Sequence, residues 1–173
     1  MIESTRIFVG YYENEDRIFI DFSDAQTRCR LWLTRRLTRR LWSAIIDILE
    51  RSSPTVSKTP ADMRKDVIAF EHLSAISRPE PTAAEPGAGP AADKADQGAA
   101  LLHKVDINFT QEAFRLVFHT AAEPKAGLTV GRTELHKILA LVDQCATAAE
   151  WDLGVATEWL RQAGPTTPEK LAS

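Results

Sequence analysis

Residues 27–51, TRCRLWLTRRLTRRLWSAIIDILER, decide the fold because the spacing of their apolar side chains changes at Thr34. Before Thr34, every second side chain is apolar: Cys29, Leu31 and Leu33. This period of two predicts a strand with one buried face. After Thr34, apolar side chains recur every three or four positions, which predicts an amphipathic helix to about Arg51 with Thr34 as its N-cap. We therefore expect a strand that leads directly into a helix.

The residues on either side of this unit predict further strands and a further helix. Residues 5–12, TRIFVGYY, and residues 17–22, RIFIDF, are rich in β-branched and aromatic side chains, and the charged turn ENED separates them. This pattern predicts an antiparallel hairpin. Further along the chain, Thr59 and Pro60 fit the N-cap and the first position of a second helix that continues to about Ser77.

The second half of the chain shows the same order of elements. Residues 103–109 and 113–118 alternate as two strands, residues 128–130 predict a short strand, and Thr133 fits the N-cap of a helix to about Ala149. This recurrence suggests an internal duplication of a β-β-β-α unit. The predicted fold class is α+β, with antiparallel β-hairpins or a meander packed against amphipathic helices. One apolar stripe predicts a last helix: Trp151, Val155 and Trp159.

Composition divides the chain into two halves joined by a linker. Residues 79–98, PEPTAAEPGAGPAADKADQG, contain 13 Pro, Gly or Ala residues and no large apolar side chain. Such a segment cannot offset the entropy cost of ordering, so we predict a flexible linker. The predicted halves are residues 1–78 and 99–163, and residues 164–173 predict a disordered tail. The sequence leaves open whether the two halves share one sheet.

Size and composition are typical of a soluble globular protein. The chain has 173 residues, of which 44% are hydrophobic and 26% are charged, and this is enough to bury a core without disulfides. Cys29 and Cys145 have no metal-type spacing, which favours a reducing compartment. The N-terminal residues do not resemble a signal peptide, and no apolar run reaches the roughly 18 residues of a membrane helix. We therefore expect a cytoplasmic protein with no membrane partner.

No set of residues has the spacing that enzyme chemistry requires. The four histidines fall singly on separate predicted elements: His72, His103, His119 and His136. We find no metal-ligand spacing around them and no nucleophile motif. Residues 127–133, GLTVGRT, resemble a phosphate-binding loop, but they are one residue short between the glycines and have Arg132 in place of lysine. We predict a protein that is not an enzyme and has no metal and no cofactor.

Arginine is concentrated around the predicted junction of strand and helix. Six arginines lie between residues 28 and 40 with no Asp or Glu among them, although the whole chain has a formal net charge of -3. Four of these arginines fall in the first two helical turns, where cations oppose the helix dipole. Two interpretations remain open. The arginines contact an anionic partner, or they form a solvated face that pairs with acids of this chain: Asp47, Glu50, Asp62 and Asp66.

The sequence favours a non-catalytic interaction protein, such as an adaptor, an assembly factor or an accessory subunit. An acidic protein partner, or a second copy of the chain, would bind a surface made of these residues: Arg28, Arg30, Trp32, Arg35, Arg36, Arg39 and Arg40. The alternative is a nucleic-acid-binding protein that uses the same residues, with Trp32 stacked on a base. A pI of about 5.8 and the lack of a known nucleic-acid-binding motif disfavour this alternative.

Overall fold

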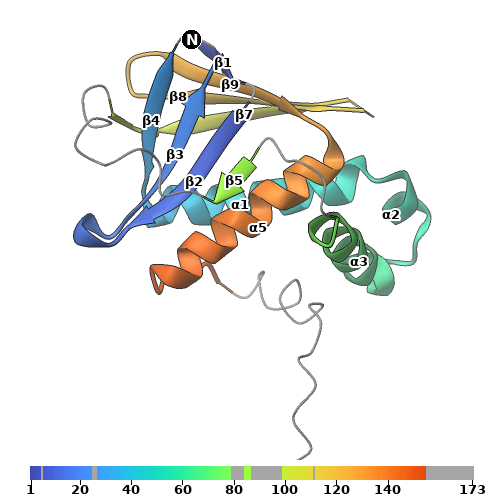
Figure 1. The fold of residues 1–173 in the computed structure, drawn as a ribbon. Coiled ribbons are helices and arrows are strands. Elements are labelled where there is room, and N and C mark those ends of the chain that lie inside the picture. The colour runs from blue at the N-terminus through green and yellow to red at the C-terminus, as the bar shows by residue number, and fades with distance from the viewer. Residues whose placement is uncertain (5, 25–26, 79–83, 87–98, 111, 155–173) are drawn as a thin grey trace, which may run out of the picture.

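The computed structural model describes residues 1–4, 6–24, 27–78, 84–86, 99–110 and 112–154. These residues form two β-sheets, with helices gathered on one side of them (Figure 1). The predicted α+β class is therefore confirmed. Within these ranges, no helix combines the length and the apolar character that a membrane span requires.

The five-stranded sheet is built on the predicted hairpin. β2 (Arg6–Tyr12) pairs antiparallel with β3 (Arg17–Ser23), and β3 pairs antiparallel with β4 (Arg28–Leu33). A 3-10 turn at Glu13–Glu15 connects β2 to β3 and ends at Asp16, where φ is 50°. The three strands form a meander, and its last strand leads directly into a helix, as the change of period predicts.

The four-stranded sheet combines three strands of the second half with one from the N-terminus. Its strands lie in the order β1-β9-β8-β7. Their bounds are Ile2–Ser4 for β1, Lys104–Phe109 for β7, Phe114–His119 for β8 and Pro124–Val130 for β9. β7, β8 and β9 form a second antiparallel meander, while β1 pairs in parallel with β9.

The two halves of the chain exchange short strands. β1 belongs to the sheet of the second half, and β6 (Ala100–Leu101) pairs in parallel with β4 of the first half. β5 (Ala84–Pro86) pairs in parallel with β2, so three residues of the predicted linker form a strand. The rest of the predicted linker and the predicted tail lie outside the described residues. The meander followed by a helix occurs in both halves, but this topology does not confirm an internal duplication.

Four α-helices lie in the described residues. They are α1 (Arg35–Ser52), α2 (Pro54–Lys58), α3 (Arg64–Ile76) and α5 (Arg132–Ala148). Thr34 caps α1 as predicted, since its hydroxyl accepts a hydrogen bond from the Leu37 N–H at 3.2 Å. The predicted helix start at Thr59 and Pro60 is wrong, because a 3-10 turn at Ala61–Met63 precedes α3.

The predicted N-cap of α5 is also wrong by two positions. Gly131, not Thr133, is the N-cap, and the Gly131 N–H donates to the Glu134 carboxylate at 3.1 Å. The last predicted helix begins at Trp151, but the described residues 151–154 are not helical and the remainder lies outside the described chain. Trp151 is nevertheless buried, and its indole N–H donates to Asp16 Oδ1 at 3.2 Å.

The apolar faces of both sheets meet the helices in one core. Phe22 of β3 and Phe118 of β8 are in contact, with ring centroids 4.6 Å apart, so the sheets touch directly. The helices contribute the stripes that their periodicity predicts: Leu41, Trp42, Ile45, Ile48 and Leu49 from α1, and Leu135, Ile138, Leu139 and Val142 from α5. Each such side chain contributes about 1.5–3 kcal/mol when fully buried, so the core stabilises both halves as one unit.

Candidate functional site

Four of the seven predicted site residues form one exposed row on α1. Arg35, Arg36, Arg39 and Arg40 are all exposed, whereas Thr38, in the same turns, is fully buried. Because residues three or four positions apart lie on one side of a helix, the four arginines follow the outer side of the first two turns. We call these four residues the arginine row.

Ion pairs within the described part of the chain do not neutralise the arginine row. None of the ion pairs among the described residues includes any of its four guanidinium groups. The expected internal partners Asp47, Glu50, Asp62 and Asp66 are likewise absent from those pairs. Four like charges in two turns oppose one another and the positive end of the helix dipole, at a few tenths of a kcal/mol each. A bound anion would relieve this repulsion.

A hollow of about 320 Å³ lies at the start of the arginine row. We call it the α1–β6 hollow, and its lining includes Thr34, Arg36, Leu37, Arg40, Leu101 and His103. β6 brings Leu101 to this position because Leu101 pairs with Trp32 in the neighbouring strand, and Leu101 remains 45% exposed. The hollow therefore offers two guanidinium groups beside apolar side chains.

Arg30 and Trp32 lie on the opposite face of β4 from the core residues, but they are not exposed to solvent. Their exposed fractions are only 5% and 8%, so the expectation that they project into solvent is wrong. Arg30 forms a two-point ion pair with Asp21 of β3, with Nε–Oδ1 and Nη2–Oδ2 distances of 2.7 Å. Its guanidinium carbon lies 3.9 Å from the centroid of Phe19, on which Trp32 also packs edge-on. A period of two identifies the face of a strand, but not what covers that face.

Arg28 is exposed but lies apart from the arginine row. It opens β4, while α1 begins after the other end of that strand. A six-residue strand spans roughly 17 Å at about 3.3 Å per residue, so Arg28 does not join the row. The structure thus brings together four of the seven predicted residues, stacks two in a buried cluster and leaves one separate.

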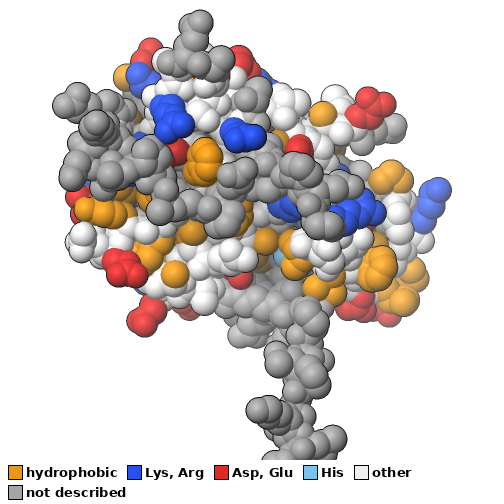
Figure 2. Space-filling view, viewed as in Figure 1, with side chains coloured by type: hydrophobic (Ala, Val, Ile, Leu, Met, Phe, Trp, Pro, Cys, Tyr) orange, Lys and Arg blue, Asp and Glu red, His pale blue; other side chains and the backbone are white. Residues whose placement is uncertain are grey.

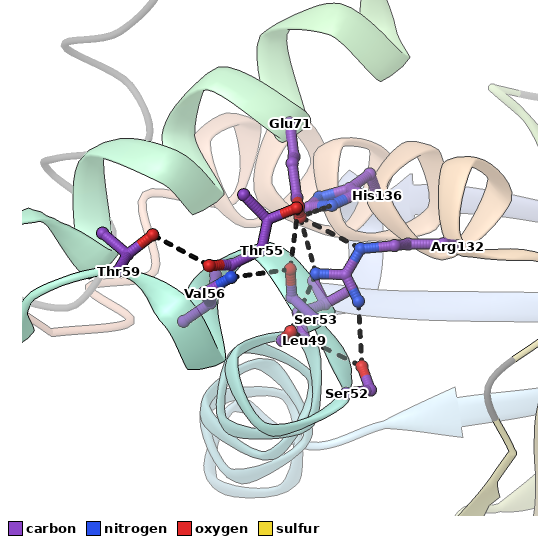
Figure 3. A network of polar contacts seen from close by, with 9 residues as sticks. All are labelled: Leu49, Ser52, Ser53, Thr55, Val56, Thr59, Glu71, Arg132 and His136. Atoms are coloured by element: carbon purple, nitrogen blue, oxygen red, sulfur yellow. Dashed lines mark hydrogen bonds and ion pairs between the residues drawn. The ribbon is translucent and has the colours of Figure 1, made fainter.

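A second polar cluster lies where the end of α1 meets α3 and α5 (Figure 3). Arg132 of α5 donates from Nε and Nη2 to Glu71 Oε2 of α3, at 3.0 and 2.6 Å. The same guanidinium donates to Ser52 Oγ at 2.9 Å and to the Leu49 carbonyl at 2.8 Å. Ser53 Oγ donates to Glu71 Oε1 at 3.0 Å. Arg132 therefore ties three helices together, and we call these five residues the Arg132 network.

Two buried histidines border the Arg132 network. His136 is 1% exposed, and its ring centroid lies 5.5 Å from that of His72, which is 7% exposed. Burial and the neighbouring His136 lower the pKa of His72 to about 4, and burial also lowers the pKa of His136. Burial alone would raise the pKa of Glu71, but its contacts with His136 and Arg132 outweigh this effect and lower the pKa to about 2. At neutral pH the carboxylate is charged and both imidazoles are neutral.

The sequence did not reveal the Arg132 network. On a helical wheel of the predicted helix to about Ala149, His136 falls on the polar side, opposite the apolar stripe, whereas the structure buries this side chain. The spacing of Arg132 and His136 does place them on one side of α5, because they are four positions apart. Their partner Glu71 precedes Arg132 by 61 residues, and no local pattern connects the two.

The described residues offer little to metal or thiol chemistry. They contain no group of three or more His, Cys, Asp or Glu side chains that could hold a metal ion. Burial raises the pKa of the Cys145 thiol to about 11 and also raises the pKa of Cys29. Because a reactive cysteine requires a lowered pKa, neither thiol has the environment of a nucleophile.

No protein-family model, curated protein or solved structure matches this chain. The described residues offer two candidate functional features, the arginine row with its hollow and the Arg132 network. These two features lie toward opposite ends of α1, roughly 20 Å apart at 1.5 Å per helical residue.

Proposed function

We propose that this protein is a non-catalytic interaction module that binds an acidic segment of another protein through the arginine row. The observation that carries this proposal is the exposed charge of the row, which no ion pair among the described residues neutralises. Each guanidinium group has a planar fork of N–H donors that fits a carboxylate at two points. An acidic segment laid along the first two turns of α1 would supply the missing negative charge.

The α1–β6 hollow supports a partner that is apolar as well as acidic. An exposed ion pair contributes only about 0.2–1 kcal/mol, so the arginine row alone would bind weakly and lose affinity in salt. A large apolar side chain placed against Leu37 and Leu101 would add about 25 cal/mol for each Å² that it buries. The expected partner segment therefore carries carboxylates for Arg36 and Arg40 and a neighbouring leucine-like or aromatic residue.

A nucleic acid is the weaker candidate for the same surface. Trp32, which the sequence offered for base stacking, is 8% exposed and packs on Phe19. The described residues that line the α1–β6 hollow include no Phe, Tyr or Trp, whereas proteins that bind single strands use platforms of such side chains. A second copy of this chain would also supply acidic side chains to the arginine row, because residues 79–173 contain 13 acidic residues against 8 basic ones.

Fluorescence anisotropy with defined peptides tests the proposal. The peptides are acidic, with and without one leucine or phenylalanine, and a single-stranded oligonucleotide of equal charge serves as the competing ligand. We expect the variant Arg36→Ala/Arg40→Ala to weaken binding of the apolar acidic peptides about tenfold or more. The matched control Arg64→Ala/Lys65→Ala removes two exposed charges from α3 and should stay within about twofold.

The same experiment can reject the proposal. Equal weakening in both double variants would mean that the overall charge of the protein, and not the arginine row, attracts the peptide. Tighter binding of the oligonucleotide, with a steep loss of affinity in salt, would replace the proposal with nucleic-acid binding. Sedimentation velocity of the unliganded protein and the Arg36→Ala/Arg40→Ala variant measures the contribution of self-association.

A further inference from the structure

The outer edge of β7 is open to a further strand. β7 pairs with β8 and with no other strand of the described chain. The other edge strands among the described residues, β1, β5 and β6, have two or three residues each, whereas β7 has six. Proteins often protect an exposed edge with a very short strand or with proline and lysine, and β7 contains one lysine and no proline. β7 is therefore the longest edge strand that the structure describes.

The hydrogen bonds of the β7–β8 hairpin identify the backbone groups that face outward. Directly after β7, the Thr110 N–H donates to the Ala113 carbonyl at 2.9 Å. Because hydrogen-bonded pairs alternate along an antiparallel ladder, every second residue of β7 bonds to β8. The residues between them direct their peptide groups away from β8: Val105, Ile107 and Phe109. Each of these residues offers one N–H and one C=O to an added strand.

α1 runs alongside this edge. His103, which directly precedes β7, lines the α1–β6 hollow together with Arg36 and Arg40. Phe109, the last residue of β7, lines a hollow of about 460 Å³ together with Arg51, near the end of α1. The helix positions 36 and 51 lie roughly 22 Å apart at about 1.5 Å per residue, and the strand positions 103 and 109 lie roughly 20 Å apart at about 3.3 Å per residue. The helix and the strand edge therefore run side by side in the same direction.

Exposed side chains of α1 connect the two hollows. Positions three or four apart lie on one side of a helix, and such a stripe of exposed positions follows the length of α1: Arg36, Arg40, Ser43, Asp47 and Arg51. A further hollow of about 430 Å³ follows this stripe from Arg36 to Asp47. Open space therefore follows α1 from the arginine row to the end of the helix.

The spacing of the arginine row matches that of side chains on a strand. Arg36 and Arg40 are about 6 Å apart along the helix axis, and side chains on one face of a strand recur about every 6.6 Å. Two carboxylates at alternate positions of an added strand would thus meet both guanidinium groups. Further along, Asp47 reverses the charge of the stripe, and Phe109 is 42% exposed beside Phe114, with ring centroids 6.2 Å apart. The complementary strand has acids at one end and an apolar side chain at the other.

A second exposed apolar surface of the described chain lies over α2 and α3 (Figure 2). Its most exposed apolar side chain is Phe70, at 72%. This surface belongs to helices, whose internal N–H and C=O groups already bond to one another, so it offers no row of main-chain partners to an extended segment. The edge of β7 is therefore the better candidate for a docking surface.

We propose that the acidic partner binds as an extended segment that adds a fifth strand to the four-stranded sheet at β7. Its main-chain groups bond to the outward peptide groups of β7, two alternate carboxylates pair with Arg36 and Arg40, and an apolar side chain packs against Phe109. This inference rests on the proposed function, because it assigns a conformation and a second contact surface to the segment that the arginine row binds. In strand addition, main-chain hydrogen bonds supply affinity and alternate side chains supply specificity.

Hydrogen exchange of the full chain, followed by NMR, tests this mode of binding. The probe is a peptide of about nine residues with glutamate at its second and fourth positions, leucine at its eighth and threonine elsewhere, and a second probe has the reverse order. At saturating peptide, exchange of the outward amides should slow about tenfold or more: Val105, Ile107 and Phe109. Amides of the exposed turn Glu13–Glu15 are the matched control and should not change. The probe that binds more tightly gives the direction of the added strand.

Methylated peptides test the main-chain hydrogen bonds without any change to the protein. Successive N–H groups of a strand point in opposite directions, so only one of the two alternate sets faces β7. Methylation of that set should weaken binding about tenfold or more in fluorescence anisotropy, while methylation of the other set should stay within about threefold. The two methylated peptides carry the same charge and the same number of methyl groups, so each is the control for the other.

Failure of strand addition is distinguishable from failure of the proposed function. If the outward amides exchange as in the free protein, or if both methylated peptides bind equally well, strand addition is wrong. The proposed function survives that result as long as Arg36→Ala/Arg40→Ala still weakens binding of the unmethylated probe. If neither probe binds the wild type, both proposals fail.

Discussion

Replacing Arg132 by alanine should destabilise the fold by about 2–3 kcal/mol. Arg132 makes four hydrogen bonds, two of them to the Glu71 carboxylate. The variant therefore leaves Glu71 without its counter-charge. Breaking a fully buried ion pair costs about 3–5 kcal/mol, but the two side chains here are 28% and 24% exposed, so solvent screens part of this penalty.

Urea unfolding followed by circular dichroism measures the loss of unfolding free energy. In a thermal scan, the melting temperature should fall by roughly 5–10 °C. Arg51→Ala is the matched control. Arg51 is an exposed arginine near the end of α1, and its guanidinium donates to the Asp47 carbonyl at 3.3 Å. This control should stay within about 0.5 kcal/mol of the wild type. If Arg132→Ala is equally stable, the Arg132 network does not hold the three helices together.

Acid should destabilise the fold between pH 6.5 and about 4, because unfolded His72 takes up a proton near 6.5 whereas its folded pKa is about 4. The loss is at most about 3 kcal/mol, and His72→Gln should flatten the stability profile measured by urea unfolding over this range. Asp21→Ala should cost about 3 kcal/mol because it leaves the buried Arg30 charge unpaired, and Asp21→Leu/Arg30→Met should recover most of the loss. If Asp21→Ala were as stable as the wild type, the Asp21–Arg30 ion pair would not be buried as described. Arg36→Glu should raise the unfolding free energy by about 0.5 kcal/mol, since an acid suits the first turn of α1, while it weakens binding to acidic peptides. A lower melting temperature would show that Arg36 has a structural role.

Local periodicity predicted the elements that form the core. The change of spacing at Thr34 located the junction of β4 and α1, and the alternation around residues 105–109 and 114–118 located β7 and β8. These elements are long enough for a pattern to repeat. β1, β5 and β6 have only two or three residues each, so they show no period, and they form because longer strands offer a free edge.

The candidate site was predictable only where exposure follows from a helical wheel. Arg35, Arg36, Arg39 and Arg40 are exposed because α1 buries its opposite side, and the sequence of α1 alone determines that side. Arg30 has an equally clear position on its strand, but its burial depends on Asp21 and Phe19 in the neighbouring strand. Similarly, the burial of His136 depends on the packing of α3 against α5. Contacts between distant segments set these properties, and single-sequence patterns do not contain them.

β1 and β6 each pair with a strand of the other half of the chain, so neither half contains all the strands of its sheet. If the backbone were cut between residues 87 and 98, each fragment would keep a strand edge that the other fragment fits. The two fragments would then be expected to assemble as a heterodimer whose stability depends on concentration, which size-exclusion chromatography of a nicked chain would show. In the intact chain the same association is intramolecular, with an effective concentration on the order of millimolar. Two intact copies could also exchange these strands with each other, so the covalent connection favours the monomer over a swapped dimer.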